Sequence, residues 1–227
     1  GSMPTNEPVL NYKPQDPETK KLKDQLASLS RGEIEIPVII NGKEVRTGKT
    51  KPCIMPHNHR HVLGRYHEAG PAEIKSAIEG SLKAWADWSR MERGERAKVF
   101  LKAADLLAGK HRMVLNAATM LGQSKTCYQA EIDAACELID FYRFNVHFAE
   151  ELNAIQPISG PGQKNHLEYR PLEGFVFAVT PFNFTSIAGN LPTSAALMGN
   201  VSLWKPASTS VYSGYFIMKL LEEAGLP

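Results

Sequence analysis

The sequence predicts an α/β fold, with an N-terminal helical region and a β-hairpin followed by the first part of a parallel β-sheet. Residues 175–179 and 201–204 are short apolar runs, and the helix-like segment 185–198 lies between them. Two apolar strands joined by a helix are typical of a parallel sheet that is covered on both faces. Asn41-Gly42 lies between two strand-like runs and favours a two-residue hairpin turn.

Composition excludes several classes of protein. The chain has 227 residues, of which 43% are hydrophobic, so it can bury a substantial core in one or two domains. Its 26 basic and 24 acidic residues give a net charge of +2 and are mostly scattered, which does not indicate a nucleic-acid partner. No apolar run reaches membrane-spanning length. Three cysteines are too few for a disulfide framework in so long a chain, so we expect a reducing compartment.

The N-terminal part is expected to contain an extended arm and a small β-structure. Residues 4–16 are polar and contain prolines, and residues 19–29 carry leucines at helical spacing. The hairpin should span 37–46, and further strands are expected near 53–55 and 61–66.

The middle of the chain is expected to be helical. Proline and glycine punctuation predicts helices that begin at Pro71, Glu92, Arg112 and Thr126, the second and third being ended by Gly109 and Gly122. In the first of these helices one face carries apolar residues, namely Ile74, Ile78, Leu82 and Trp85. A connector at 156–165 and a strand at 166–170 should follow, and the last helix, 211–224, should end at Gly225. These elements suggest three parts, residues 1–35, 36–170 and 171–227.

Asn183 lies just beyond the carboxyl end of the first predicted parallel strand. Ligands of such sheets bind in the crevice at the carboxyl ends of the strands. The amide of Asn183 could donate a hydrogen bond to a developing oxyanion. Asparagine is also common in turns for backbone reasons, so both interpretations stay open at this point.

Lys205 follows the second predicted strand directly. It could contact the ribose hydroxyls or phosphate of a nucleotide, or it could be a solvated strand-end lysine. Ser208 could bind the same ribose, but it is also a natural N-cap for the last helix.

Glu137 is the charged member of an otherwise apolar helix face that includes Ala134, Phe141 and Phe144. We therefore expect its carboxylate to be partly buried and to need a partner. The partner is either an internal cation, such as Arg143 or Arg170, or the ammonium group of a substrate.

Three alternating histidines, His57, His59 and His61, could share one strand face. No acidic residue and no cysteine other than Cys53 completes a fitting ligand set, so we predict a polar surface loop and no metal site.

At this point the motifs resemble a known family. Residues 180–184, Thr-Pro-Phe-Asn-Phe, followed by the strand 201–204 and then Lys205-Pro206, resemble the aldehyde dehydrogenase superfamily. Similarity to the branch called Δ1-pyrroline-5-carboxylate dehydrogenases, which oxidise L-glutamate γ-semialdehyde, extends over segments 99–105, 129–145, 156–159 and 172–175. The resemblance runs from about residue 5 to the end and implies that the sheet begins a Rossmann-like cofactor domain.

The resemblance assigns roles to matching positions. In this family a cysteine thiolate attacks the aldehyde, hydride passes to NAD, and water hydrolyses the thioester. Asn183 matches the oxyanion donor, Phe184 the aromatic wall around the substrate, and Glu137 the carboxylate near the amino group of the substrate. Positions that match cofactor contacts are Val179, Thr180, Pro181, Phe182, Lys205, Pro206 and Ser208. Because many members carry a carboxylate where Ser208 stands, the resemblance leaves the choice between NAD and NADP open.

The resemblance also implies what the chain lacks. The nucleophilic cysteine and the water-activating glutamate lie downstream in family members, and Cys53, Cys127 and Cys136 match neither motif. We expect Cys136 to be a core residue and the 227-residue chain by itself not to oxidise aldehydes.

For the full-length protein, the resemblance implies oxidation of glutamate semialdehyde to L-glutamate in proline catabolism. It further implies a homo-oligomer, a dimer, in the cytoplasm or, in a eukaryote, in the mitochondrial matrix. Two alternatives are a non-catalytic binding or assembly module and a related aldehyde dehydrogenase with another substrate.

Overall fold

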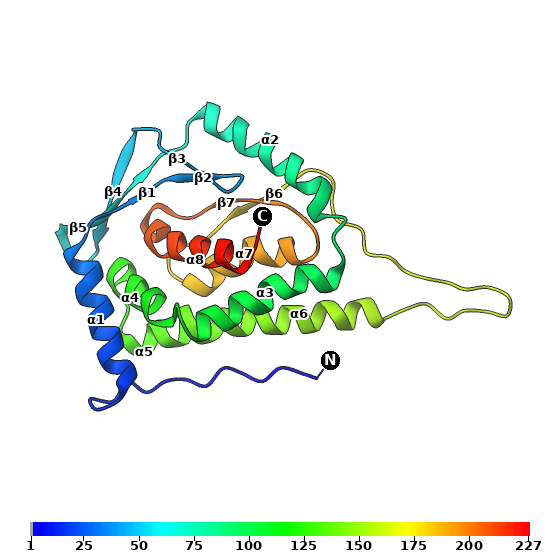
Figure 1. Ribbon diagram of the computed structural model, residues 1–227, viewed down its shortest axis with the longest axis horizontal. Coiled ribbons are helices and arrows are strands. Elements are labelled where there is room, and N and C mark those ends of the chain that lie inside the picture. Colours follow the sequence, from blue (N-terminus) through cyan, green and yellow to red (C-terminus); the bar gives the residue numbers. More distant parts are fainter. Residues whose placement is uncertain (1) are drawn as a thin grey trace.

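The computed structural model describes residues 2–227 and has helices in its centre (Figure 1). The helices are α1 (Pro17–Arg31), α2 (Pro71–Trp88), α3 (Arg93–Ala108), α4 (Arg112–Gln123), α5 (Cys127–Ala130), α6 (Leu138–Ala154), α7 (Thr185–Leu197) and α8 (Val211–Ala224). A π-helix, η1 (Glu131–Glu137), joins α5 to α6, and a 3-10 helix, η2 (Ser208–Ser210), precedes α8. The strands are β1 (Ile34–Ile36), β2 (Val38–Ile40), β3 (Lys43–Val45), β4 (Thr50–Met55), β5 (Asn58–His67), β6 (Val176–Val179) and β7 (Ser202–Lys205). The α/β class predicted from the sequence is confirmed.

The strands form three small sheets. β5 lies between β1, which is parallel to it, and β4, which is antiparallel. β2 and β3 form the expected hairpin, and Asn41 and Gly42 have φ angles of 52° and 75°. Positive φ at both central residues is what a primed two-residue turn requires.

β6 and β7 pair in parallel, as predicted, with Val179 opposite Lys205. Helix α7 follows β6 along the chain. It packs against both strands and against helices α3 and α6 (Figure 1). α7 lies so close to the start of α6 that a Cβ on Gly189 would be 2.8 Å from Leu138 Cδ1. A glycine at this position therefore lets α7 sit against the helix that carries Glu137 at its amino end.

The main hydrophobic core lies between α3, α6, α7 and α8. Its fully buried large side chains include Phe100, Leu107, Tyr142, Ile217 and Leu220. Burial of this many apolar side chains is the principal term that holds these helices together.

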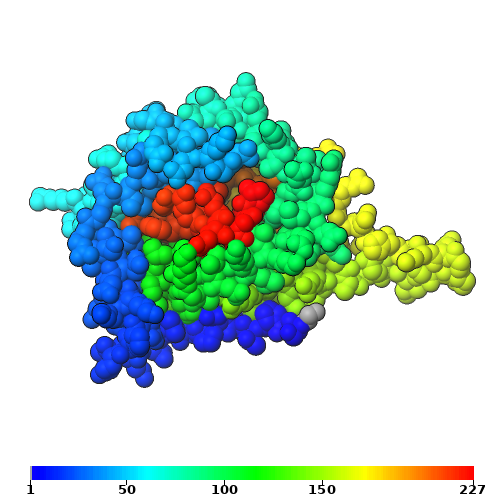
Figure 2. Space-filling view, viewed as in Figure 1, coloured from blue at the N-terminus to red at the C-terminus, as the bar shows by residue number. Residues whose placement is uncertain are grey.

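Several sequence-based expectations are wrong in detail. The expected strand 166–170 does not form, because the connector from Ile155 projects away from the body and no neighbouring strand pairs with it (Figures 1 and 2). Gly122 does not end α4; the left-handed residue after this helix is Ser124, with φ 53°. On α2, Ile74 and Leu82 of the predicted apolar face are exposed.

The predicted burial of both sheet faces is also wrong within residues 2–227. Side chains alternate along a strand, so Ala178 is buried while Phe177 and Val179 on the other face are each 59% exposed. α7 packs on one face of β6, and the side chains of Phe177 and Val179 on the other face are left exposed.

Candidate active site

The candidate site is the loop of residues 180–184 between β6 and α7. Thr180 anchors its first residue: its N–H donates to the carbonyl oxygen of Lys205 at 3.2 Å, and its Oγ1 accepts from Trp204 Nε1 at 2.9 Å. Thr180 is buried, whereas Phe182, Asn183 and the next residue are exposed. The structure therefore brings the loop and the end of β7 together at one edge of the sheet, as the sequence predicted.

Asn183 has a free carboxamide at this edge. Its side chain is exposed and makes no hydrogen bond to any other residue within 2–227. The NH2 group is therefore available to donate to an oxygen that enters the site.

Phe184 occupies the N-cap position of α7 and is 41% exposed. The ammonium group of Lys125, from the turn between α4 and α5, lies 4.8 Å from the centre of its ring. A cation over the face of an aromatic ring stabilises that ring position. Lys125 is a neighbour of the site that sequence reasoning did not identify, since nothing in its local sequence marks it.

The burial predicted for Glu137 is wrong. It is exposed, and neither Arg143 nor Arg170 pairs with it; Arg143 binds Glu7 and Asp105 instead. The core-facing side of α6 is another stripe, which includes Ile139 and Val146, and the acids of η1 that are buried are Glu131 and Asp133. Glu137 Oε2 lies 3.0 Å from Ser186 Oγ at the start of α7, which places its carboxylate beside the candidate loop.

Two buried acids of this π-helix were missed. Glu131 is fully buried and Asp133 is 5% exposed. The signal was present in principle, since both acids lie next to alanines in a segment where close helix packing is expected. Their partners come from distant parts of the chain, so the sequence could not name them.

At the end of β7, Lys205 and Ser208 are both exposed. The expected capping role of Ser208 is wrong, because Ser208 opens η2 and the N-cap of α8 is Ser210, whose hydroxyl donates to Ala207 O. The Ser208 hydroxyl is therefore not occupied in a helix cap and faces solvent near the sheet edge.

The polar loop predicted for the three histidines is confirmed only for His57, which lies in the turn between β4 and β5; His59 and His61 are residues of strand β5. His57 Nδ1 lies 2.9 Å from Ser124 Oγ. Across residues 2–227 no group of three or more histidine, cysteine, aspartate or glutamate side chains is arranged to hold a metal ion. In the same part of the chain, no helix is both long and apolar enough to cross a membrane.

The cysteines are unsuited to nucleophilic attack. Cys53 and Cys136 are buried, and burial raises the pKa of each thiol to about 12. Burial also raises the pKa of Cys127, which is partly exposed. The thiolate is the reactive form, so little of it is present at neutral pH in any of the three.

We accordingly expect slow thiol labelling of the native 227-residue chain. With a disulfide reagent at pH 8, Cys127 should react first, while Cys53 and Cys136 should react only after the chain is unfolded. Mass spectrometry of the labelled peptides measures the order. Rapid labelling of Cys136 in the native chain would contradict its burial.

The family described as "Aldehyde dehydrogenase family" matches residues 44–227. This chain belongs to the aldehyde dehydrogenase family. The match includes η1, the loop at 180–184 and the end of β7, so all the predicted site residues lie within the family segment.

Two similar proteins have the same name. A "Delta-1-pyrroline-5-carboxylate dehydrogenase" from Agaricus bisporus is 53% identical over 98% of this chain and 41% of the relative. The mitochondrial protein of the same name from Homo sapiens is 47% identical over 98% of this chain and 39% of the relative.

A solved structure agrees with these sequence matches. The Delta-pyrroline-5-carboxylate dehydrogenase from Mycobacterium tuberculosis bound with NAD superposes with a TM-score of 0.98 at 53% identity. The superposition covers 100% of this chain and 43% of the Mycobacterium tuberculosis chain. The chain thus spans about two fifths of the length of the aldehyde dehydrogenases it resembles.

Proposed function

We propose that this chain is the N-terminal part of an NAD-dependent dehydrogenase that oxidises L-glutamate γ-semialdehyde to L-glutamate in proline catabolism. The observation that carries the proposal is the loop at the end of β6, where the unpaired amide of Asn183 lies next to Phe184 and near the exposed carboxylate of Glu137. The names and NAD-bound structure of the relatives support it.

The exposed groups at this edge fit the parts of a dinucleotide. Val179 and Phe182 offer exposed apolar surface at the end of β6. Lys205 and Ser208 offer exposed hydrogen-bond donors at the end of the neighbouring strand β7, so one cofactor could lie across both strand ends. In the proposal Val179, Thr180 and Phe182 line the nicotinamide end, and Lys205 and Ser208 contact the adenosine ribose. Pro181 and Pro206 are further proposed cofactor contacts. NAD supplies the acceptor for the hydride that leaves the substrate.

The residues of this chain would act on the substrate in three ways. Asn183 donates a hydrogen bond to the aldehyde oxygen as it becomes an oxyanion. Phe184 provides an apolar wall for the aliphatic chain. Glu137 attracts the substrate ammonium group, because its carboxylate is exposed and has no cationic partner within residues 2–227.

An activity assay on the full-length polypeptide that contains this chain tests the proposal. We expect thiol-dependent reduction of NAD with glutamate semialdehyde and a lower kcat/KM with simple aliphatic aldehydes. Equal rates on both kinds of aldehyde would favour a related dehydrogenase with another substrate. The 227-residue chain alone is expected to give no turnover.

Glu137→Gln tests the substrate assignment. The amide keeps the shape of the side chain but loses its charge, so kcat/KM for glutamate semialdehyde should fall by about tenfold while an aldehyde without an ammonium group is unaffected. Steady-state rates with the two substrates measure the difference. An equal fall for both would mean that Glu137 does not receive the ammonium group.

A second candidate, a binding or assembly module, is favoured by the exposed apolar face of β6. Phe177 and Val179 form part of that face, and an apolar face next to unpaired strand edges promotes association. Titration of the chain with NAD and its sedimentation behaviour separate the two functions, since a pure assembly module should associate without binding NAD.

The proposal includes the assembly and organisation of the full-length enzyme. We propose a homodimer, in the cytoplasm of a bacterium or the mitochondrial matrix of a eukaryote. We also propose the division into residues 1–35, 36–170 and 171–227. Limited proteolysis should cut first in the exposed connector that precedes the third part.

A further inference from the structure

The amino end of α7 is capped by a carboxylate from another helix. Asp133 Oδ2 accepts the N–H of Thr185 at 2.8 Å, and Oδ1 accepts the N–H of Ser186 at 3.0 Å. The N-cap residue itself, Phe184, has no side-chain acceptor, and the first turn of α7 contains no acid. Asp133 thus satisfies N–H groups that the local sequence leaves unpaired, and its negative charge lies at the positive end of the helix dipole.

Ser186 connects Asp133 to Glu137, the residue proposed to bind the ammonium group of the substrate. Its Oγ lies 2.7 Å from Asp133 Oδ1 and 3.0 Å from Glu137 Oε2. A hydroxyl has one proton and donates to one of these carboxylates at a time. Ser186 therefore links Asp133 to Glu137 through one hydroxyl group.

The side chain of Thr185 is fixed by a further helix, α4. Its Oγ1 lies 3.0 Å from Thr119 Oγ1 and accepts from Gln123 Nε2 at 3.1 Å, both on α4. Gln123 also donates to Ser213 of α8. Because Thr185 is fully buried, the first turn of α7 has little freedom to move.

The loop between these anchors carries the site. Its first residue, Thr180, is held by β7, and its last by the capped turn of α7, so Asn183 lies on a short exposed segment fixed at both ends. We propose that Asp133 is a positioning residue, which sets the location of Asn183 by capping α7 and, through Ser186, that of Glu137. This inference rests on the function proposed above.

Asp133→Asn in the full-length enzyme tests the inference. The amide NH2 cannot accept a hydrogen bond, so Thr185 or Ser186 loses its acceptor and the loop shifts. A misplacement of about 1 Å can lower a rate by about 10²-fold, so we expect kcat to fall by about tenfold or more. The KM for NAD should change less than kcat, because the contact proposed for Lys205 lies on β7, outside the loop that shifts.

Asp140→Asn is the matched control. Asp140 lies on α6 and also accepts a backbone N–H, that of Glu7 at 2.8 Å, but it faces the N-terminal arm. The same substitution there should leave kcat unchanged.

A double-mutant cycle separates positioning from general stability. If Asp133 acts through Asn183, adding Asp133→Asn to Asn183→Ala should lower kcat by less than about twofold more. Fully additive effects, or an unchanged kcat in Asp133→Asn, would overturn the inference. If Asn183→Ala itself leaves kcat unchanged, the proposed function fails instead.

Hydrogen exchange gives a readout that does not depend on activity. Amides of Thr180 and of residues 182–186 should exchange faster in full-length Asp133→Asn than in the wild type, and an unchanged rate there would count against the inference. Should Asp133→Asn not fold, Ser186→Ala removes only the hydroxyl bridge. It should raise the KM for glutamate semialdehyde several-fold, and an unaltered KM would overturn the link to Glu137.

Discussion

Replacement of Asn183 by alanine in the full-length enzyme should lower kcat by about 10²-fold or more with glutamate semialdehyde. The side chain is exposed at the sheet edge and makes no hydrogen bond within residues 2–227, so its amide has no structural role to lose. A donor that is fixed before reaction stabilises the oxyanion without reorganisation, and its removal affects mainly the transition state. Steady-state and single-turnover kinetics measure the loss.

Two further measurements make this result specific. The melting temperature of Asn183→Ala should match that of the wild type, because the exposed amide holds nothing in place. KM for the aldehyde should change less than kcat, since the interaction strengthens only as charge develops on oxygen. A variant with normal kcat would show that Asn183 is only a turn residue, the other interpretation of its sequence context.

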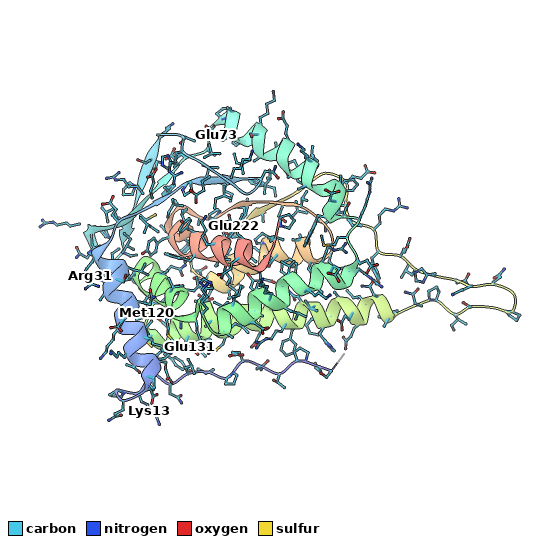
Figure 3. All side chains as sticks on the ribbon, viewed as in Figure 1. Lys13, Arg31, Glu73, Met120, Glu131 and Glu222 are labelled. Carbon is cyan, nitrogen blue, oxygen red and sulfur yellow. The ribbon has the colours of Figure 1, made fainter. Side chains whose placement is uncertain are left out.

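The largest effect on stability is expected from Glu131→Gln. Glu131 is fully buried on η1 and accepts hydrogen bonds from Tyr12 Oη at 2.8 Å and from the N–H of Leu10 at 2.7 Å, both in the N-terminal arm. It also pairs with Arg112, whose side chain is 5% exposed. Figure 3 shows Glu131 on the helix that lies along the arm. Breaking a buried ion pair costs about 3 kcal/mol or more when the other charge is left unpaired; Arg112 keeps its ion pair with Glu7 at 2.9 Å, so we expect a loss of about 2–3 kcal/mol.

Thermal unfolding and proteolysis measure this prediction. Chymotrypsin should cut the arm more readily after Tyr12 in Glu131→Gln, because the contacts that hold Leu10 and Tyr12 are weakened. Asp105→Asn is the control: Asp105 pairs with Arg143 but is 78% exposed, and exposed pairs contribute about 1 kcal/mol or less. Equal stability of Glu131→Gln and the wild type would mean that this pair does not hold the arm.

The stability lost in Glu131→Gln should become smaller at acidic pH. Burial raises the pKa of Glu131, but hydrogen bonds from Arg112, the Leu10 amide and Tyr12 outweigh it and hold the pKa below its ordinary value. A carboxylate with a lowered folded-state pKa contributes stability above its unfolded pKa, about 4.3, and loses it as the pH falls through the folded pKa. The difference in stability between wild type and Glu131→Gln should therefore shrink below about pH 4.

The sequence by itself determined the elements whose signals are local. Asn41-Gly42 requires positive φ at both residues and specified the hairpin, and Gly225, with φ 101°, ended α8. The apolar runs on either side of α7 specified two parallel strands, and with them the place of Asn183 and Lys205 at one edge. These features follow from backbone sterics and side-chain periodicity, which act over a few residues.

The tertiary structure decided which acids are buried and what holds the loop. The helix face that carries Glu137 was expected in the interior, but the structure buries Glu131 and Asp133 of η1 and leaves Glu137 exposed. The partners of the two buried acids are an arm over a hundred positions away and the start of α7. A charge is buried only where such distant donors meet it, and no local pattern reports where distant donors will be.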